Sequence, residues 1–562
     1  MPGERSVLYS GYRPQTLRGG GGGSSVSFVT TAGETLPARA DKARPVIALL
    51  DERSSVHTGL LTLKAQGLAQ LVSEGRLDDG PAVRTTQVEM GGGVTATVRL
   101  SELAIPLRVD AVLPRRVRAE GKDDTLQKAL ELARKPARKV RAREGELPPA
   151  QWQPDRAYAD MLYPSREYRL LALFRFWNVI QRFYPYKNLM DRDWDEALGT
   201  WLPRFEKAPD AAGYALAVAE MSTLLQDGHV TVRGHPELDK RGLGGVAPPF
   251  EVMELEGKAV VMGVMDAEAA PGLARGQVVE TLDGKPLAER LEALKPYVTA
   301  STPAHLRGKL LEQALSGPEG SQGTLGVKEG TGPLKQVRFT RSVKSFQKPP
   351  PGEAWRLLAN NLGYVDLTRL QVADVPTVFD KLKGTRALVL DMRGYPRRTA
   401  WPMAPYLNTR KSRFGAVIER PLVSADEEVS RLKFFQELPR ANVPLYRGRT
   451  VMLIDERAIS QAEHSGLFFE AANGTTFIGT PSAGVNGDIT DLVLPGGISL
   501  TFTGHDIRHL DGRQLQRVGL TPQVYARPTL AGVQAGRDEV LDKALEYLNK
   551  GSPLPVSGEA AR

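Results

Sequence analysis

Ser460, at a predicted junction between a strand and a helix, is the leading candidate for a catalytic residue in this sequence. Residues 450–454 form an apolar run that predicts a buried strand, and from Ser460 onward small and apolar residues recur at helical spacing. In parallel α/β sheets, functional sites form where a strand ends and the next helix begins. A hydroxyl at this place could act as a nucleophile, provided that the rest of the chain supplies a base, an oxyanion hole and a substrate-binding element.

The same residues also fit a purely structural role. Ser460, Gln461, Ala462 and Glu463 spell a capping box, in which the serine and glutamate side chains satisfy backbone N–H groups of the first helical turn. Both interpretations place Ser460 at the start of a helix, so the remainder of the chain has to decide between them.

The composition indicates a globular chain without thiol chemistry. Its 562 residues allow several domains, and 41% of them are hydrophobic while 25% are charged. Because the chain has no cysteine and its seven histidines form no HExxH motif, we expect neither a metal nor a cofactor. No window approaches the roughly 20 apolar residues of a membrane span, and residues 1–18 lack the apolar core of a secretory signal.

Much of the net charge of +9 lies within residues 115–143. We predict a helix over residues 124–134, which the following Lys135-Pro136 pair interrupts. Because no aromatic residues are interleaved with the basic ones, the segment resembles no nucleic-acid-binding motif, and a solvated face explains it better. We therefore expect no nucleic-acid partner.

Changes in composition along the chain suggest a series of domains. The expected parts are a flexible lead at 1–25 that ends in a glycine run, a β-rich N-terminal domain with the basic helix and a linker at 26–150, a helical part at 160–240, a β-rich block at 246–345, an α/β block at 353–550 and a polar tail at 551–562.

The strand patterns of the two larger blocks differ. Within 246–345, the hairpin pattern of residues 276–287 resembles a PDZ domain, which captures extended chains by adding them to a sheet. Within 353–550, residues 386–391 are apolar almost throughout, as expected of a parallel strand covered on both faces. We therefore expect an α/β catalytic core with a helical N-terminal part and an inserted PDZ-like β-rich domain, and an additional N-terminal β-rich domain.

Several short motifs between about residues 160 and 550 occur in an order that resembles one peptidase family. They are Asp227-Gly228-His229, Asp391-Met-Arg-Gly394-Tyr-Pro396, Ala458-Ile-Ser460-Gln461-Ala462-Glu463, Gly479-Thr-Pro-Ser-Ala-Gly484-Val-Asn-Gly487 and Gly519-Leu-Thr-Pro522-Gln-Val. Each motif is weak alone, but their order, with a PDZ-like block in the expected place, resembles the tail-specific, C-terminal-processing serine peptidases and their tricorn-like relatives. The resemblance implies a ClpP/crotonase-like catalytic core, and residues 1–150 lie outside it.

What the resemblance implies is a serine-type peptidase in which Ser460 attacks a peptide carbonyl and forms an acyl-enzyme. It assigns the oxyanion hole to the backbone N–H groups of Gly394 and Gln461. Both groups suit that role physically, because the Gln461 N–H lies at a predicted helix N-terminus and Gly394 has no side chain to obstruct a tetrahedral oxygen. For Gly394, an ordinary turn after a strand is the alternative explanation.

One departure from the family pattern concerns the base. Processing peptidases of this family use a lysine in a Gly-Lys-Gly context, where this chain has Gly484-Val-Asn-Gly487. Tricorn-like members use a histidine instead, and His229 occupies that motif position. We therefore expect His229 to accept the proton of Ser460, with a structural role as the alternative for this single histidine.

The sequence does not decide which residue is the third catalytic member. The family's usual acidic residue aligns with Gln516, which can orient an imidazole by hydrogen bonding but carries no negative charge. Glu463 and Asp488 are the carboxylates considered for the same role.

The function expected from the sequence is hydrolysis of peptide bonds in extended or unfolded polypeptides. The alternative is a catalytically weak or inactive peptide-binding protein on the same fold. A polypeptide is the expected partner, and a homo-oligomer is left open. The location is unknown; because related proteins are often exported, a periplasmic or secreted location is left open as well.

Overall fold

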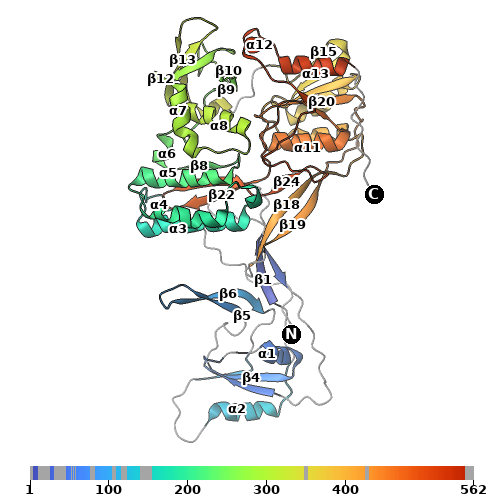
Figure 1. The fold of residues 1–562 in the computed structure, drawn as a ribbon. Helices are drawn as coiled ribbons and strands as arrows, with labels where there is room; N and C mark the ends of the chain where they lie inside the picture. Colours follow the sequence, from blue (N-terminus) through green and yellow to red (C-terminus); the bar gives the residue numbers. More distant parts are fainter. Residues whose placement is uncertain are drawn as a thin grey trace. The chain divides into compact units, whose positions relative to one another are not determined.

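Two compact units make up the chain in the structure, which is a computed structural model (Figure 1). One unit comprises Met1–Gly11, Ser24–Gln153 and Leu422–Ser430, and the other comprises Tyr12–Gly23, Pro154–Pro421 and Arg431–Arg562. The structure describes residues 4–9, 26–30, 46–51, 53–54, 56, 58–75, 83–103, 109–114, 123–138, 155–346, 352–424 and 429–550. Within these ranges, no helix is both long and apolar enough to cross a membrane.

An antiparallel sheet in the first unit begins with the N-terminal strand. β1 (Glu4–Tyr9) pairs with β2 (Val26–Thr30) and with β6 (Thr95–Leu103), which pairs in turn with β5 (Val83–Glu89). Leu8 and Tyr9 also lie opposite Ser424 and Val423, at the end of β18 (Phe414–Ser424). Within the lead expected at 1–25, residues 4–9 form β1, whose backbone has pairing partners on both sides. The rest of that lead and the expected tail at 551–562 lie outside the described residues.

A second sheet of the same unit is parallel and carries helices. β3 (Val46–Leu50), β4 (Ala69–Glu74) and β7 (Ala111–Leu113) form it, and α1 (Thr58–Gln66) and α2 (Asp124–Ala133) pack against it. The unit expected to be β-rich is thus mixed α/β. α2 confirms the helix predicted within the basic segment: the Asp123 side chain accepts from the Leu126 N–H at its start, and the helix ends before Lys135-Pro136.

In the second unit, the predicted helical part packs on a small sheet built from distant segments. The helices are α3 (Arg166–Phe183), α4 (Trp194–Glu206) and α5 (Ala211–Ser222), with short turns η3 (Lys187–Leu189), η4 (Thr223–Leu225) and α6 (Pro236–Asp239). β8 (Thr231–Arg233) follows them and pairs with β23 (Ile498–Thr503), which pairs with β22 (Ile489–Leu494). A C-terminal hairpin therefore completes the helical part.

The β-rich block at 246–345 forms an antiparallel sheet with two helices. Its strands are ordered β14-β13-β11-β10-β9, with β12 beside β11, and its elements are β9 (Phe250–Leu255), β10 (Lys258–Val264), β11 (Val278–Leu282), β12 (Lys285–Pro286), α7 (Leu287–Leu294), η5 (Lys295–Tyr297), α8 (Pro303–Leu315), β13 (Gln322–Lys328), β14 (Lys335–Thr340) and η6 (Val343–Phe346). The predicted hairpin of residues 276–287 is present as β11 and β12. The block does not have a separate hydrophobic core. Its Phe250 and Phe339 share one core with Phe176 of α3 and Leu500 of β23.

A six-stranded sheet, ordered β15-β16-β17-β20-β21-β25, organises the α/β block. Neighbours from β16 to β25 are parallel and β15 is antiparallel; the strands are β15 (Trp355–Leu358), β16 (Leu362–Asp366), β17 (Ala387–Asp391), β20 (Arg449–Ile454), β21 (Thr476–Gly479) and β25 (Val524–Tyr525). The strand predicted at 450–454 is β20, and the one predicted at 386–391 is β17.

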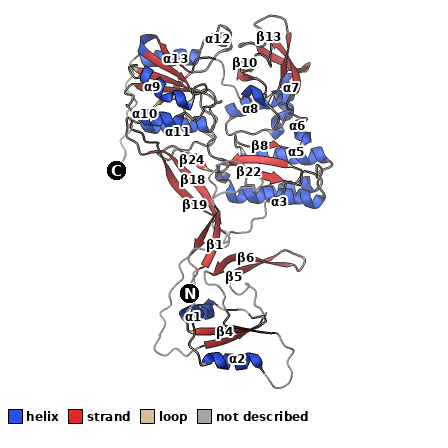
Figure 2. Cartoon of the chain, turned by 180° about the vertical axis from the view of Figure 1, so that it is seen from behind, coloured by secondary structure: helices blue, strands red, loops and turns tan. Residues whose placement is uncertain are grey.

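Helices cover both faces of this sheet, as Figures 1 and 2 show for α11 and α13. Met452 and Ile454 of β20 pack toward the helices α9 (Val375–Leu382), α10 (Ala400–Leu407) and α11 (Gln461–Asn473). Val451 and Leu453, which point the other way, pack toward α13 (Glu539–Asn549). This alternation explains why the strands are apolar throughout. The remaining elements are η7 (Ala359–Asn361), η8 (Val372–Asp374), β19 (Val429–Glu437), β24 (Asp506–Arg508) and α12 (Leu530–Gln534).

Candidate active site

Ser460 lies between β20 and α11 in a conformation that residues with a side chain seldom adopt. Its φ is 55° and its ψ is −112°, and it is the N-cap residue of α11. Its hydroxyl makes no capping hydrogen bond, so the serine half of the capping box is absent. Such backbone strain costs about 1–3 kcal/mol and clusters at active sites, where a sharp strand-to-helix turn presents a nucleophile.

A loop that follows β21 holds this turn in place. The Ser460 N–H donates to the Val485 carbonyl at 2.9 Å, and the Ala483 N–H donates to the Ala458 carbonyl at 3.0 Å. The buried Glu463 carboxylate secures the loop from the helix side, accepting from Ser482 Oγ at 2.5 Å, the Gly484 N–H at 2.8 Å and the Val485 N–H at 2.9 Å.

The role of Glu463 is therefore to hold the loop that carries Val485. Burial raises the pKa of Glu463 to about 8, against the opposing effect of its hydrogen bonds from Ser482, Gly484 and Val485.

The two segments that carry the backbone N–H groups expected at the oxyanion hole are linked by a side-chain hydrogen bond. Gln461 is the first residue of α11, and among the described residues its N–H has no hydrogen-bond partner. Its Oε1 accepts from the Arg398 N–H at 3.2 Å, which ties α11 to the loop that carries Gly394. The Gly394 N–H itself donates to the Met392 carbonyl at 2.8 Å.

A buried ionic network anchors the loop that carries Gly394 at the end of β17. Arg393 binds Asp391 and Asp538 with both ends of its guanidinium, and the Tyr364 hydroxyl donates to Asp391 at 2.7 Å. Burial alone would raise the pKa of Asp391, but the charge and hydrogen bonds of Arg393 outweigh it and bring that pKa to about 2. A Cβ atom at Gly394 would lie 2.9 Å from Thr368 Cγ2, so only glycine fits this close approach.

His229 lies in the short connection between η4 and β8, and its side chain is buried. Its Nδ1 is 2.8 Å from Thr503 Oγ1, whereas its buried Nε2 has no hydrogen-bond partner among the described residues. Burial lowers the pKa of His229 below its ordinary value, and Asp227 opposes that effect. The imidazole is therefore kept neutral, with one ring nitrogen unused.

The loop that holds Ser460 also touches the loop that holds His229. A Cβ atom built on Gly228 would lie 2.6 Å from Val485 Cγ1 and 2.7 Å from His305 Cε1. Val485 thus contacts the His229 loop through its side chain and Ser460 through its carbonyl. Val485 therefore contacts both the segment that carries Ser460 and the segment that carries His229.

Each of the three residues considered as the third catalytic member contacts groups other than the His229 ring. Gln516 Nε2 is 3.5 Å from Asp227 Oδ1 and 3.3 Å from Ser301 Oγ. Asp488 Oδ2 is 3.4 Å from His505 Nδ1, and Glu463 binds the loop described above.

The residues found beside the His229 ring, Thr503 and Asp227, are ones to which the sequence analysis assigned no role. In the sequence, Asp227 stands out only as the first residue of the Asp227-Gly228-His229 motif. Thr503 could be found only from the register of β23 against β8.

A second polar group reaches the backbone of the His229 loop. Lys309 Nζ of α8 donates to the Gly228 carbonyl at 3.0 Å and also to the Val230 carbonyl. Burial lowers the pKa of Lys309 to about 8. Lys309 therefore binds the carbonyl groups of the residues immediately before and after His229.

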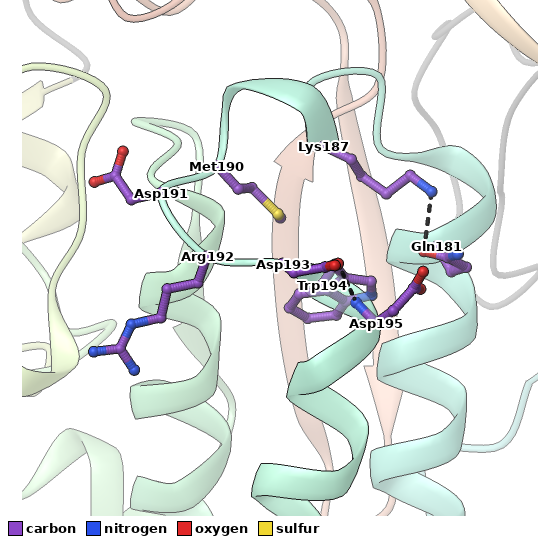
Figure 3. A pocket seen from close by; sticks show the side chains of 8 residues that line it. All are labelled: Gln181, Lys187, Met190, Asp191, Arg192, Asp193, Trp194 and Asp195. Carbon is purple, nitrogen blue, oxygen red and sulfur yellow. Dashed lines mark hydrogen bonds between the residues drawn. The ribbon is translucent and has the colours of Figure 1, made fainter.

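A pocket beside α3, η3 and α4 is lined by none of these residues (Figure 3). Its lining residues are Gln181, Lys187, Met190, Asp191, Arg192, Asp193, Trp194 and Asp195. Several of its polar groups are already paired: Lys187 Nζ donates to Gln181 Oε1 at 2.9 Å, the Asp193 side chain caps α4, and Asp191 accepts from Arg517 at 3.0 Å. Within the described part of the chain, no cluster of His, Asp and Glu could hold a metal ion.

Comparison with known proteins identifies the block that carries Ser460 and Gly394. Residues 361–526 match the model of Peptidase family S41. No curated protein matches the chain.

Among solved structures, mature CPAF is 13% identical, with 70% of this chain and 99% of that chain covered and a TM-score of 0.52. A mutant of CPAF gives 12% identity, the same coverage and a TM-score of 0.53. The photosystem II D1 C-terminal processing protease is 18% identical over 65% of this chain and 96% of that chain, with a TM-score of 0.40. Residues 361–526 are thus identified as a domain that matches Peptidase family S41, and through this domain the protein is a serine-type peptidase.

Proposed function

We propose that this peptidase hydrolyses extended or unfolded polypeptides through an acyl-enzyme on Ser460. The observation that carries the proposal is the strained conformation of Ser460 at the end of β20, with a hydroxyl that is not used to cap α11. A serine that only capped the helix would have β-region backbone angles and a side-chain bond to the first turn. The strain is instead what a presented nucleophile requires.

The proposed reaction follows from the groups around Ser460. Its Oγ attacks the peptide carbonyl carbon while His229 Nε2 accepts the hydroxyl proton. The N–H groups of Gln461 and Gly394 stabilise the negative charge that develops on the carbonyl oxygen. The bond to the amine then breaks, His229 returns the proton to the leaving nitrogen, and water later hydrolyses the ester with His229 again as the base.

His229 is the base in this proposal for two reasons. Its Nε2 is free of other partners, and burial lowers its pKa, so the ring is neutral and able to accept a proton at neutral pH. Lys309, the buried amine nearby, is a poorer candidate because its Nζ already donates to the carbonyls of Gly228 and Val230. For the Gly394 N–H to join the oxyanion hole, its bond to the Met392 carbonyl has to yield to the substrate oxygen.

We further propose that the block at 246–345 is a PDZ-like domain inserted into a peptidase with a ClpP/crotonase-like core. Its edge strand β9 packs beside α8 and has β10 as its only strand partner in the sheet order of the described residues. An extended segment of substrate pairs with β9 in this proposal. The alternative, a weak or inactive peptide binder, places peptide on β9 without chemistry at Ser460.

Labelling with a fluorophosphonate tests the proposed function. The wild type should be modified at Ser460, as located by mass spectrometry of its peptides, and Ser460→Ala should be neither labelled nor able to cleave a casein-type unfolded substrate. Ser465→Ala is the matched control, because Ser465 lies one turn further along α11 and only donates to the Gln461 carbonyl at 2.7 Å. Labelling and turnover that persist in Ser460→Ala would overturn the proposal, and peptide binding without labelling of the wild type would establish the alternative.

A further inference from the structure

The two ring nitrogens of His229 differ in their surroundings. Nδ1 has one partner, Thr503 Oγ1, at 2.8 Å. Nε2 is buried and has no hydrogen-bond partner among the described residues. Which nitrogen carries the proton of the neutral ring therefore depends on whether Thr503 donates or accepts.

Asp227 decides the direction of that hydrogen bond. Thr503 Oγ1 donates to Asp227 Oδ1 at 2.8 Å, and the Thr503 N–H donates to Asp227 Oδ2 at 2.6 Å. A carboxylate accepts only, and a hydroxyl has one proton to give. Because Thr503 gives its proton to Asp227, its oxygen must accept from the ring, so Nδ1 carries the hydrogen and Nε2 carries the lone pair.

Strand register explains why Thr503 and not a carboxylate faces the ring. On the antiparallel pair of β8 and β23, Thr231 lies opposite Thr501 and Arg233 opposite Ser499. Continued by two residues beyond β8, the same register sets His229 opposite Thr503, the last residue of β23. Asp227 lies two residues earlier and wraps back to both donors of Thr503.

We propose that Asp227 and Thr503 together replace the acidic residue of the catalytic triad, with Thr503 relaying the charge of Asp227 to the His229 ring. The proposal rests on the proposed function of Ser460 and His229. Thr503 and Asp227 are positioning residues: they set the ring tautomer and its orientation and do not touch substrate. One proton moves in each step, between Ser460 Oγ or the leaving group and Nε2, and the hydrogen on Nδ1 stays where it is.

The relay also stabilises the imidazolium that forms when Nε2 takes the proton. The Nδ1–H then donates to an oxygen whose own hydrogen points at a carboxylate, so the hydroxyl dipole favours the positive ring. The other charged or titratable groups around His229 are Lys309, His305 and Asp488. Gln516 also approaches Asp227 Oδ1, at 3.5 Å, so it adds to the support of Asp227 and does not compete for the ring.

Three threonine variants test the relay through the pH dependence of kcat/KM. Thr503→Val keeps the shape of the side chain and removes the relay; we expect kcat/KM to fall by about 10²–10⁴-fold, mainly in kcat, and its acidic limb to move to lower pH. Thr503→Ser restores the hydroxyl and should recover most of the rate and the wild-type limb. Thr501→Val is the matched control, because Thr501 Oγ1 donates to the His229 carbonyl at 2.6 Å and not to the ring. Thr501→Val removes a hydrogen bond from the His229 loop, and the acidic limb of its kcat/KM profile should stay at the wild-type pH.

The rate of fluorophosphonate labelling at Ser460 separates this proposal from the one on which it rests. Absence of labelling in the wild type would overturn both. Labelling of the wild type with an unchanged rate and limb in Thr503→Val would overturn the relay alone. If Thr503→Val does not fold, the nitrogen shifts of ¹⁵N-labelled histidine in the wild type, assigned through His229→Gln, decide: a hydrogen on Nδ1 supports the relay, and a hydrogen on Nε2 overturns it.

Discussion

Ser460 and Val485 are joined by a backbone hydrogen bond of 2.9 Å, from the serine N–H to the valine carbonyl. The N–H groups of Gly484 and Val485 donate to Glu463, and the Val485 side chain meets the His229 loop at Gly228. The proposed nucleophile Ser460 and the loop of the proposed base His229 thus both contact one loop residue, although they come from segments far apart in the chain. A displacement of Val485 should therefore disturb both at once.

Replacing Ser460 by glycine should stabilise the protein. At φ 55° and ψ −112° a residue with a Cβ atom stores about 1–3 kcal/mol, which glycine does not, although glycine loses about 0.5–1 kcal/mol through backbone entropy. We expect Ser460→Gly to unfold at higher urea concentration than the wild type, by about 1 kcal/mol, and Ser460→Ala to stay within about 0.5 kcal/mol of it. If Ser460 were only a helix cap, alanine would cost about 0.5–2 kcal/mol and glycine a few tenths.

Adding one methyl group at Gly228 should damage catalysis through Val485. In Gly228→Ala the new Cβ atom would overlap Val485 Cγ1 and His305 Cε1, so the loops have to separate, at a cost of about 1–3 kcal/mol. Misplacement by about 1 Å costs roughly 10²-fold in rate, so kcat/KM per folded molecule should fall by that factor. Gly199→Ala is the matched control, since Gly199 lies inside α4 with no atom near the new methyl group, and it should be more stable by about 1 kcal/mol with unchanged kcat/KM. Full activity in Gly228→Ala would contradict the positioning role of Val485.

The pH–rate profile should distinguish His229 from Lys309 as the base. Burial lowers the pKa of His229 below its ordinary value of about 6.5, and the base must be unprotonated to act. Activity should therefore be lost as pH falls below about 6.5, with the midpoint at a more acidic value. A lysine base would place the limb near the Lys309 pKa, which burial lowers to about 8. The limb is read from kcat/KM between pH 4 and 9 on a reporter ester, and a limb that persists in His229→Ala would remove His229 from the mechanism.

The elements that position Ser460 were predictable from local sequence, and their distant partners were not. The apolar run at 450–454 predicts β20, and the helical spacing after Ser460 predicts α11, because burial on both faces and the 3.6-residue period leave patterns within a few residues. The basic helix α2 and the hairpin of β11 and β12 were also predictable, because their patterns likewise lie within a few residues.

The pairing of β8 with β23 leaves no such local pattern. His229 and Thr503 are 274 positions apart, and only the register between their strands brings them together. Sequence motifs therefore point to Gln516, Glu463 and Asp488 and give no signal for Thr503. β1 likewise has no local pattern that predicts it, because it pairs with β2, β6 and β18, which are distant in the sequence or separated from it by a glycine run.

The outer edge of β9 gives a test of how polypeptide substrate is held. In an antiparallel pair, successive residues direct their backbone polar groups alternately toward the partner strand and away from it. The Glu254 carbonyl accepts from Arg527 Nη2 at 2.8 Å, so Glu254, and with it Val252, faces away from β10. A substrate strand added at this edge would bond to the Val252 N–H and carbonyl.

Val252→Pro should weaken cleavage of long substrates and spare short ones. Proline at an edge position removes one outward N–H while leaving the bonds between β9 and β10 in place, so the domain should still fold. Binding energy remote from the scissile bond serves only a substrate long enough to reach β9. We therefore expect kcat/KM for an unfolded polypeptide to fall by about tenfold, the equivalent of one lost hydrogen bond of about 1.4 kcal/mol, while kcat/KM for a short reporter ester stays unchanged. Val252→Ala, which keeps the N–H and loses side-chain volume, should leave the ratio of the two rates at the wild-type value. Equal losses on both substrates in Val252→Pro would show that the strand supports the structure of the peptidase and does not hold substrate.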